Sequence, residues 1–364
     1  MASFNGHFPP FGTDGSGDEW DDWDPDRARR GYTGHVPALR DLDVRPNAPI
    51  DLPTPVPRQQ GGSGSGALSP AGLAASARVE TADYLSVTYD QRDPGFAELY
   101  DAVIVPQWCM PFGRLLLSVF LTLARDPGCQ VLDVACGTGY PTLELARYLG
   151  QDCDLAGIDT WEEAIQIARR KAAEEWLRNV TFLTADVLNS GLPERSFDVL
   201  TCNLALAHFA DRAAALGAMW RLLRPQGNLL LTLPLQSAMR EFLDTYYLTL
   251  RDLRLDNSLR QFSQFVSSQP TIDATRGLVE RSGFEVRRAA TDSVTLRFPS
   301  PAAFLRSPVV QTTYMPSWRS VVPDMTIRRL VFNEVERRLT ARAEARGGEL
   351  AMTVPMLCVY AVRI

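Results

Sequence analysis

The amino-acid sequence predicts an α/β fold with a doubly wound sheet, and three observations support this prediction. An apolar run, Val131 to Val134, leads into a turn that contains Gly137 and Gly139, and the helical segment 142–149 follows. Two later apolar runs each end in an aspartate, and another follows a Pro-Gln-Gly turn. A strand, a tight glycine turn and a helix form the opening unit of a doubly wound α/β sheet.

The first 80 residues differ in composition from the rest of the chain. They contain an acidic stretch with Trp20 and Trp23, a proline-rich stretch at 46–57 and a Gly/Ser run at 61–66. Such a segment cannot bury enough apolar surface to offset the entropy of ordering it. We expect residues 1–80 to be a disordered, solubilising tail. The alternative is that the two tryptophans form a short docking motif for a protein partner.

Residues 81–125 are predicted to be helical. The segment 81–87 has helical character, and a second helix is expected over 94–103, with Asp93 as its cap and Pro94 in the first turn. A longer helix is expected over 106–124. Its most apolar part, 115–124, is too short to cross a bilayer, so no membrane span is predicted.

The strands that follow end in polar residues. Runs at 155–159, 180–186 and 197–203 read as the second to fourth strands, and 222–233 contains a helix end, a turn and a fifth strand. Asp159 follows Gly139 at the interval typical of a ribose-binding carboxylate. It also precedes a helix expected over 161–175, so Asp159 or Thr160 is a candidate N-cap, and both roles are compatible.

The C-terminal part continues the alternation of helices and strands. Helices are expected over 241–255, 271–282 and 327–346, and a strand from 284 that the alternating run 293–298 extends. The apolar run 356–362 should be a buried final strand.

Bulk properties exclude several classes of function. The net charge is −6, so the chain lacks the basic surface typical of nucleic-acid binding. The six cysteines show no C-x-x-C spacing and there are three histidines, so no metal site is predicted. Most cysteines lie in apolar stretches and are expected to be small buried side chains, which fits a reducing cytoplasm. No signal peptide is expected at the start. The oligomeric state stays open.

These motifs resemble those of the class I S-adenosylmethionine-dependent methyltransferases. The run 131–139 matches the family's glycine-loop signature, and the segments 157–159 and 185–187 match its ribose and adenine acids. Later core motifs match at 197–199 and 222–227, where Gln226 replaces a more common glycine. The resemblance implies a Rossmann-like, seven-stranded methyltransferase sheet over 126–364, its last strand antiparallel, behind a helical cap at 81–125.

The resemblance also implies S-adenosyl-L-methionine as the cofactor. Its predicted binding residues lie at the carboxyl ends of the first four strands: Asp133, Ala135, Gly137, Thr138, Gly139, Asp159, Thr160, Asp186, Val187 and Asn203. A nicotinamide dinucleotide is disfavoured. Its pyrophosphate needs a close contact between helix and strand, usually given by a third glycine, and Thr142 stands at that position. The negative charge of Asp133 near the turn suits a cationic sulfonium better than a phosphate.

The expected reaction is methyl transfer to a small-molecule acceptor, with O-, C- and N-methylation left open. The pattern is nearest to ubiquinone/menaquinone-type and natural-product methyltransferases. The segment 203–211 lacks the Asp/Asn-Pro-Pro-Tyr/Phe motif of nucleobase amino-methyltransferases. His208 in this segment is a candidate general base, but packing among apolar neighbours is the favoured interpretation. The alternative function is a protein that binds the cofactor without turnover and acts through a partner.

The acceptor pocket is expected to involve the cap and an insertion at about 236–324. Two groups of aromatic residues are candidates for its lining, although core packing is the more common role for such side chains: Tyr89, Tyr100 and Trp108 in the cap, and Phe242, Tyr246, Tyr247, Phe262, Phe265 and Tyr314 in the insertion. A carboxylate acceptor could be held by Arg251, Arg254 or Arg260, whose spacing equally suits an exposed helix face.

Overall fold

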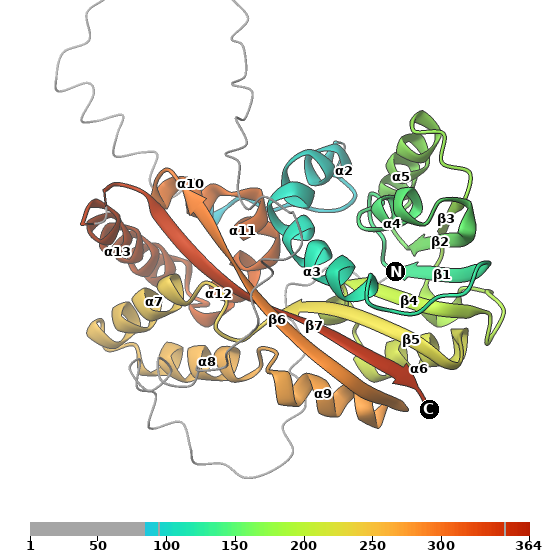
Figure 1. Cartoon of the computed structure of the whole chain (residues 1–364). Helices are drawn as coiled ribbons and strands as arrows, with labels where there is room; N and C mark the ends of the chain where they lie inside the picture. The colour runs from blue at the N-terminus through green and yellow to red at the C-terminus, as the bar shows by residue number, and fades with distance from the viewer. Residues whose placement is uncertain (1–83, 94, 346) are drawn as a thin grey trace, which may run out of the picture. The chain divides into compact units, whose positions relative to one another are not determined.

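A computed structural model of the chain describes residues 84–93, 95–345 and 347–364. The predicted tail and its candidate docking motif lie outside these residues. The centre is a seven-stranded sheet of order β3-β2-β1-β4-β5-β7-β6 (Figure 1). The strands are β1 (Cys129–Val134), β2 (Cys153–Asp159), β3 (Val180–Thr184), β4 (Phe197–Asn203), β5 (Leu223–Pro234), β6 (Phe284–Phe298) and β7 (Leu350–Arg363).

Helices connect these strands. In chain order they are α2 (Phe96–Leu99), η2 (Tyr100–Cys109), α3 (Met110–Phe120), α4 (Thr142–Leu149), η3 (Gly150–Asp152), α5 (Glu162–Glu174), η4 (Val187–Asn189), η5 (Leu206–His208), α6 (Arg212–Leu222), α7 (Arg240–Asp252), α8 (Asp256–Ser267), α9 (Ile272–Arg281), α10 (Pro301–Arg306), α11 (Pro308–Thr313), α12 (Met315–Val321) and α13 (Met325–Glu344).

The pairing of the strands confirms the predicted fold class. β1 to β5 pair in parallel, whereas β7 lies antiparallel between β5 and β6. Leu132, Leu200 and Leu231 in the central strands are fully buried, as expected where helices cover both faces of a parallel sheet. Gln226 adopts a φ of 65°, which explains why glycine is common at this turn position.

The helical cap differs from the separate helices predicted over 94–103 and 106–124. One continuous helix runs from Phe96 to Phe120, and the ten residues of η2 within it have π-helical hydrogen bonding and include Pro106. Proline removes a backbone donor, and a wider turn accommodates the missing bond. The helix begins after Gly95, while the Asp93 carboxylate accepts from the backbone N–H of Asp90. Where a helix was predicted over 81–87, the described residues Tyr84 and Leu85 form a single 3₁₀ turn.

This continuous helix also corrects the expectation about its length. Phe96–Phe120 spans 25 residues, which is long and apolar enough to cross a membrane by length and composition. In its most apolar window, 56% is buried inside the protein, and core helices of soluble proteins meet the same criterion. The prediction that the apolar helix is too short is therefore wrong, and its burial is what argues against a span.

The last two strands extend beyond the rest of the sheet. The pairing of β5 with β7 ends at Pro234 and Met356, whereas β6 and β7 continue to pair as far as Phe298 and Leu350. The helices α7, α8, α10, α12 and α13 gather around this end of the β6–β7 ribbon (Figure 1). We call them, together with α11, the helical subdomain. Most of the segment 236–324 lies in it, but β6 belongs to the main sheet.

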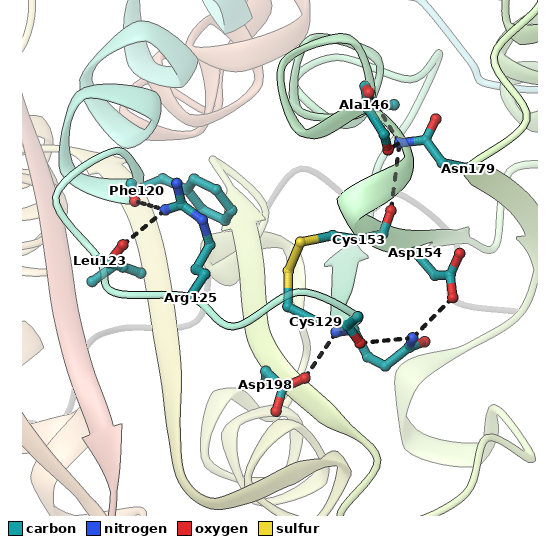
Figure 2. Close-up of a disulfide and its surroundings, with 12 residues drawn as sticks. Phe120, Leu123, Arg125, Cys129, Ala146, Cys153, Asp154, Asn179 and Asp198 are labelled. Atoms are coloured by element: carbon teal, nitrogen blue, oxygen red, sulfur yellow. Dashed lines mark hydrogen bonds between the residues drawn. A yellow bond between two sulfur atoms is a disulfide. The ribbon is translucent and has the colours of Figure 1, made fainter.

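A disulfide joins the first residues of β1 and β2. Cys129 and Cys153 are bonded, with their Cα atoms 4.6 Å apart (Figure 2). The expectation of free thiols is wrong for this pair, because the register of the parallel strands sets the two residues opposite one another. The other four cysteines, Cys109, Cys136, Cys202 and Cys358, are buried thiols as predicted. Since disulfides are rare in a reducing cytoplasm, cytoplasmic localisation stays a prediction.

Candidate functional site

Two glycines in the loop between β1 and α4 leave the backbone there without side chains, so that a ligand can approach it closely. Gly137 and Gly139 have φ values of 53° and 98°. A Cβ added at Gly139 would lie 2.9 Å from Leu143 Cδ1 and 3.1 Å from Ala168 Cβ, so a side chain does not fit there. At Gly137 the nearest atom would be a ring carbon of Tyr100 at 3.7 Å, an ordinary contact. Ala135 shares the left-handed backbone, with φ of 57°.

Thr138 lies between these glycines and carries a polar atom without a partner. The residue is 1% exposed, and its hydroxyl makes no hydrogen bond to the described part of the chain. A buried hydroxyl normally has a partner, because leaving it unsatisfied costs about 1–3 kcal/mol. The hydroxyl is thus available to a molecule bound against the loop.

Asp133 lies beneath the loop and holds it to its neighbours. Its Oδ2 accepts from the hydroxyl of Thr142 at 2.5 Å, and its Oδ1 accepts from that of Thr201 at 2.7 Å. These bonds join β1 to the first residue of α4 and to β4. Burial raises the pKa of Asp133 to about 6, although both hydroxyl bonds favour the ionised form. The carboxylate is therefore a buried negative charge that a nearby cation would stabilise.

Asp159, at the end of β2, is aimed at the same loop. Its Oδ2 accepts from the backbone N–H of Gly137 at 2.8 Å, and its Oδ1 accepts from that of Trp161 at 2.9 Å. Burial raises its pKa above the usual value, while the backbone hydrogen bonds lower it. Asp159 thus holds a backbone donor just before α5, but the N-cap of α5 is Trp161 and no side chain caps the helix, so the prediction that Asp159 or Thr160 is the cap is wrong. Each oxygen can still accept another hydrogen bond, as the ribose role requires.

The end of β3 lies beside Asp159. The backbone N–H of Ala185 donates to the carbonyl of Asp159 at 2.9 Å, which brings Asp186 and Val187 next to the end of β2. Asp186 Oδ1 accepts from the N–H of Leu188 and so caps η4, and Val187 is buried. Thr160 is exposed. The predicted adenine and ribose residues are thus neighbours at one edge of the sheet.

Asn203 is more deeply engaged within the protein than the sequence suggests. Its Nδ2 donates to the carbonyl of Cys109 at 3.2 Å, and its Oδ1 accepts from the hydroxyl of Thr232 at 2.6 Å. The side chain therefore links the ends of β4 and β5 to the cap helix.

Tyr140, which the sequence motifs did not single out, makes a second link to the cap. Its hydroxyl donates to the carbonyl of Met110 at 3.1 Å. A Cβ on Gly113 would lie 2.8 Å from Tyr140 Cζ, so glycine allows the ring to pack on α3. Because Cys109 and Met110 mark the junction of η2 and α3, two bonds fix this junction to the glycine loop and to β4.

Aromatic side chains join the cap to the end of β2. Phe96 stacks on Trp161 at 5.6 Å, and both rings contact Tyr100. Tyr89 packs on Phe96 at 5.5 Å, and Trp161 Nε1 donates to the carbonyl of Gln91 at 3.1 Å. The sequence pointed to Tyr89 and Tyr100 here but not to Trp161, although its position directly after Asp159-Thr160 was the available signal.

The structure places His208 at the surface of η5. The residue is exposed, whereas Leu206 beside it is 1% exposed, so the favoured interpretation of His208 as a buried packing residue is wrong. Desolvation by the surrounding protein, and then Arg212, lower the pKa of His208. Because the ring remains accessible to solvent, its desolvation is incomplete, which limits this downward shift. Asp211, considered as an orienting carboxylate, instead accepts from the N–H of Ala214 and caps α6.

We expect His208→Ala to change the turnover number by less than about tenfold, since loss of a general base would reduce it by about 10²–10⁴-fold. Because the lowered pKa leaves the imidazole of His208 neutral at pH 7, the dependence of the rate on pH does not by itself distinguish a general base from a residue without a catalytic role. Single-turnover rates with cofactor affinity measured in parallel test this expectation, with His208→Asn as the polar control. A thousandfold slower rate in a folded variant that binds cofactor normally would establish the base role.

The other candidates for the lining of the acceptor pocket differ in how exposed their side chains are. Phe242, Tyr246 and Phe262 are buried in the helical subdomain, whereas Tyr247 and Phe265 are half-buried. The candidate arginines, Arg251, Arg254 and Arg260, are all exposed. Arg251 pairs with its neighbour Asp252, and Arg260 with Asn257, which fits the exposed-face interpretation.

Among the described residues, no group of three or more His, Cys, Asp or Glu side chains could hold a metal ion.

Comparison with known proteins gives consistent results. A family model described as "Methyltransferase domain" matches residues 125–267. The ubiquinone/menaquinone biosynthesis C-methyltransferase UbiE of Teredinibacter turnerae is 29% identical over 168 residues, which cover 43% of this chain and 68% of that protein. A solved structure of a putative methyltransferase from Bacillus halodurans is 16% identical, with a TM-score of 0.45, and the match covers 68% of this chain and 98% of that one.

One relative extends the similarity beyond the core domain. Nocamycin O-methyltransferase from Saccharothrix syringae is 30% identical over 282 residues, which cover 72% of this chain and 94% of that protein. Similarity over nearly the whole length of a methyltransferase, together with the matched domain, establishes that this chain belongs to the S-adenosylmethionine-dependent methyltransferases.

Proposed function

We propose that this enzyme transfers a methyl group from S-adenosyl-L-methionine to an oxygen atom of a small-molecule acceptor. The observation that carries the cofactor assignment is the Asp159 carboxylate, which faces the glycine loop through Gly137. The preference for oxygen rests on the nocamycin O-methyltransferase, which aligns over 72% of this chain, whereas the C-methyltransferase above aligns over 43%.

The residues present fit this cofactor. Thr138 has a buried hydroxyl without a partner, and Gly139 has no room for a Cβ. The buried carboxylate of Asp133 and the half-buried carboxylate of Asp159 gather negative charge at the loop, which favours a cation over a phosphate.

We assign the roles of the binding residues by their place around the loop. When bound, S-adenosyl-L-methionine supplies a methyl group on a positively charged sulfur. Asp159 would hold the ribose hydroxyls, with the exposed Thr160 beside it, and Asp186 with Val187 would border the adenine. The loop 135–139 would receive the methionine part. Asp133 orients this loop through Thr142, and its negative charge lies beneath the place proposed for the positively charged sulfur. Asn203 holds the cap in place, and the cap excludes water from the site.

The proposal also covers the class of acceptor, a protein partner and the cellular location of the enzyme. The acceptor is a small molecule rather than a nucleic acid, consistent with the net charge of −6. A protein partner for the N-terminal tail and a cytoplasmic location are further parts of this proposal.

The raised pKa of Asp133 predicts a pH-dependent preference between cofactor and product. Burial raises this pKa to about 6, so protonation stabilises the fold at low pH and that contribution is lost as the pH rises through 6. Cationic S-adenosylmethionine favours the ionised carboxylate, whereas the sulfur of S-adenosylhomocysteine is neutral. The ratio of the two affinities should therefore fall by about threefold or more from pH 7.5 to pH 5.5.

Calorimetric titration of both molecules at several pH values measures this ratio. Asp133→Asn keeps the size of the side chain but removes its charge, so the ratio should become independent of pH in that variant. A wild-type ratio that stays constant across this range would show that Asp133 does not interact with the sulfonium.

The proposed function is tested with a cofactor labelled with ¹³C in the methyl group. The enzyme is incubated with a metabolite extract from the organism that produces it. The carbon chemical shift of the labelled product then distinguishes methyl groups on oxygen, nitrogen and carbon. An O-methyl product supports the proposal, and a C- or N-methyl product contradicts it. Binding of S-adenosylhomocysteine without any labelled product would favour the role without turnover.

A further inference from the structure

Tyr314 lies where the helical subdomain meets the cap helix. It joins α11 to α12 and is 9% exposed. Its ring meets Trp108 of η2 edge-on at 5.6 Å and stacks on Trp318 of α12 at 5.3 Å. Three aromatic side chains from two separate parts of the chain thus form one continuous wall.

The hydroxyl of Tyr314 is buried and makes no hydrogen bond within the described residues. The same is true of Trp318 Nε1 and Ser307 Oγ, which lie on the same stretch of chain. The hydroxyl of Tyr246, in contrast, donates to the carbonyl of Trp318 at 2.9 Å. An unsatisfied buried hydroxyl destabilises the fold, and phenylalanine would form the same ring contacts without it. The stability of this packing therefore gives no reason for a tyrosine at position 314.

The aromatic wall is close to the cofactor edge of the sheet. Trp108 immediately precedes Cys109, whose carbonyl accepts from Asn203 at the end of β4. Ligands of open α/β sheets bind at the carboxyl ends of the strands. Tyr314 is therefore on the side of the helical subdomain that faces the expected site of methyl transfer.

The chemistry of the wall selects a class of acceptor. Two unsatisfied groups belong to this wall, the phenol of Tyr314 and the indole N–H of Trp318. Both are neutral and both can donate a hydrogen bond. Burial raises the pKa of Tyr314, so the phenol keeps its proton. Aromatic walls favour a flat apolar molecule, and neutral donors favour a carbonyl or enol oxygen over an ammonium group.

We propose that Tyr314 recognises the acceptor by donating a hydrogen bond from its hydroxyl to a carbonyl or enol oxygen of a flat, largely apolar molecule. This inference rests on the proposed function, since it names the acceptor class of that site. The hydroxyl is enclosed, so α11 and α12 move away from Trp108 when an acceptor enters.

The test compares two probes that differ in one oxygen. 1-Tetralone has a carbonyl group on the same ring system as tetralin, which has none. Both are titrated into the protein saturated with S-adenosylhomocysteine, and binding is followed by ligand-observed NMR. Wild-type protein should bind tetralone about fivefold more tightly than tetralin, the range for one neutral hydrogen bond.

The variant Tyr314→Phe should abolish this preference without lowering the Tm, because the hydroxyl it removes has no partner among the described residues. Tyr246→Phe is the matched control: it loses the bond to Trp318, so the Tm should fall while the preference for tetralone remains. A preference that persists in Tyr314→Phe would overturn the inference, as would failure of the wild type to bind tetralone or to prefer it. These outcomes leave the proposed function intact, whereas failure to bind S-adenosylhomocysteine would contradict that function itself.

Discussion

Replacing Asp159 by alanine is expected to weaken S-adenosylmethionine binding by about 1.5–3 kcal/mol, or roughly 10- to 150-fold, the range for losing hydrogen bonds to a charged group. The carboxylate lies at the end of β2, where it accepts from the N–H groups of Gly137 and Trp161. Removing it takes away the ribose acceptor and also releases the glycine loop from β2. Isothermal titration calorimetry measures the change in affinity.

Asp159→Asn separates the two consequences of this change. The amide retains one acceptor oxygen, so it can keep one of the two backbone bonds, but it has no charge. We expect the loss of affinity to persist in part while thermal stability recovers toward the wild-type value. Unchanged affinity in a folded Asp159→Ala variant would exclude the ribose role and leave Asp159 with only its structural bonds to the backbone N–H groups of Gly137 and Trp161.

The sheet and the cofactor edge could be predicted because their signals are local. A parallel strand buried on both faces must be apolar throughout, and the acids at its end mark the carboxyl edge of the sheet. This pattern identifies the end of β2 at Asp159, whereas β3 is an edge strand with mostly exposed residues and ends at Thr184, two residues before Asp186. The glycine loop was equally clear, because the backbone at Gly139 excludes any Cβ.

The parts that could not be predicted depend on contacts between distant segments. Pro106 suggested a helix boundary, but packing keeps the helix continuous through a π-helical segment. Asn203 was assigned to the cofactor, yet its amide bonds to a carbonyl 94 residues away in the sequence. The pairing of Cys129 with Cys153 follows from the strand register, which composition does not contain. Spacing identifies a strand end, whereas only tertiary structure shows which partner its side chain reaches.

The two loop glycines are predicted to differ sharply in what substitution does to them. Gly139→Ala places a Cβ 2.9 Å from Leu143 and forces an L-residue to a φ of 98°, which together should cost roughly 3 kcal/mol of stability. For a domain of this size that corresponds to a fall in Tm of about 6–10 °C. Gly137→Ala meets only an ordinary contact with Tyr100 at 3.7 Å, and its φ of 53° lies in the region that other residues occasionally adopt.

The contrast between these variants tests whether the loop serves the fold or the cofactor. Gly137→Ala should lower stability by about 1 kcal/mol but weaken cofactor binding by about tenfold or more, because its Cβ occupies the side of the loop that faces the proposed site. Gly139→Ala should instead show the larger loss of stability, roughly 3 kcal/mol. Thermal melts and calorimetry on the two purified variants distinguish these effects. Equal losses of stability in the two variants would show that a shift of α4 relieves the clash with Leu143. Normal cofactor affinity in Gly137→Ala would show that Gly137 does not contact the cofactor.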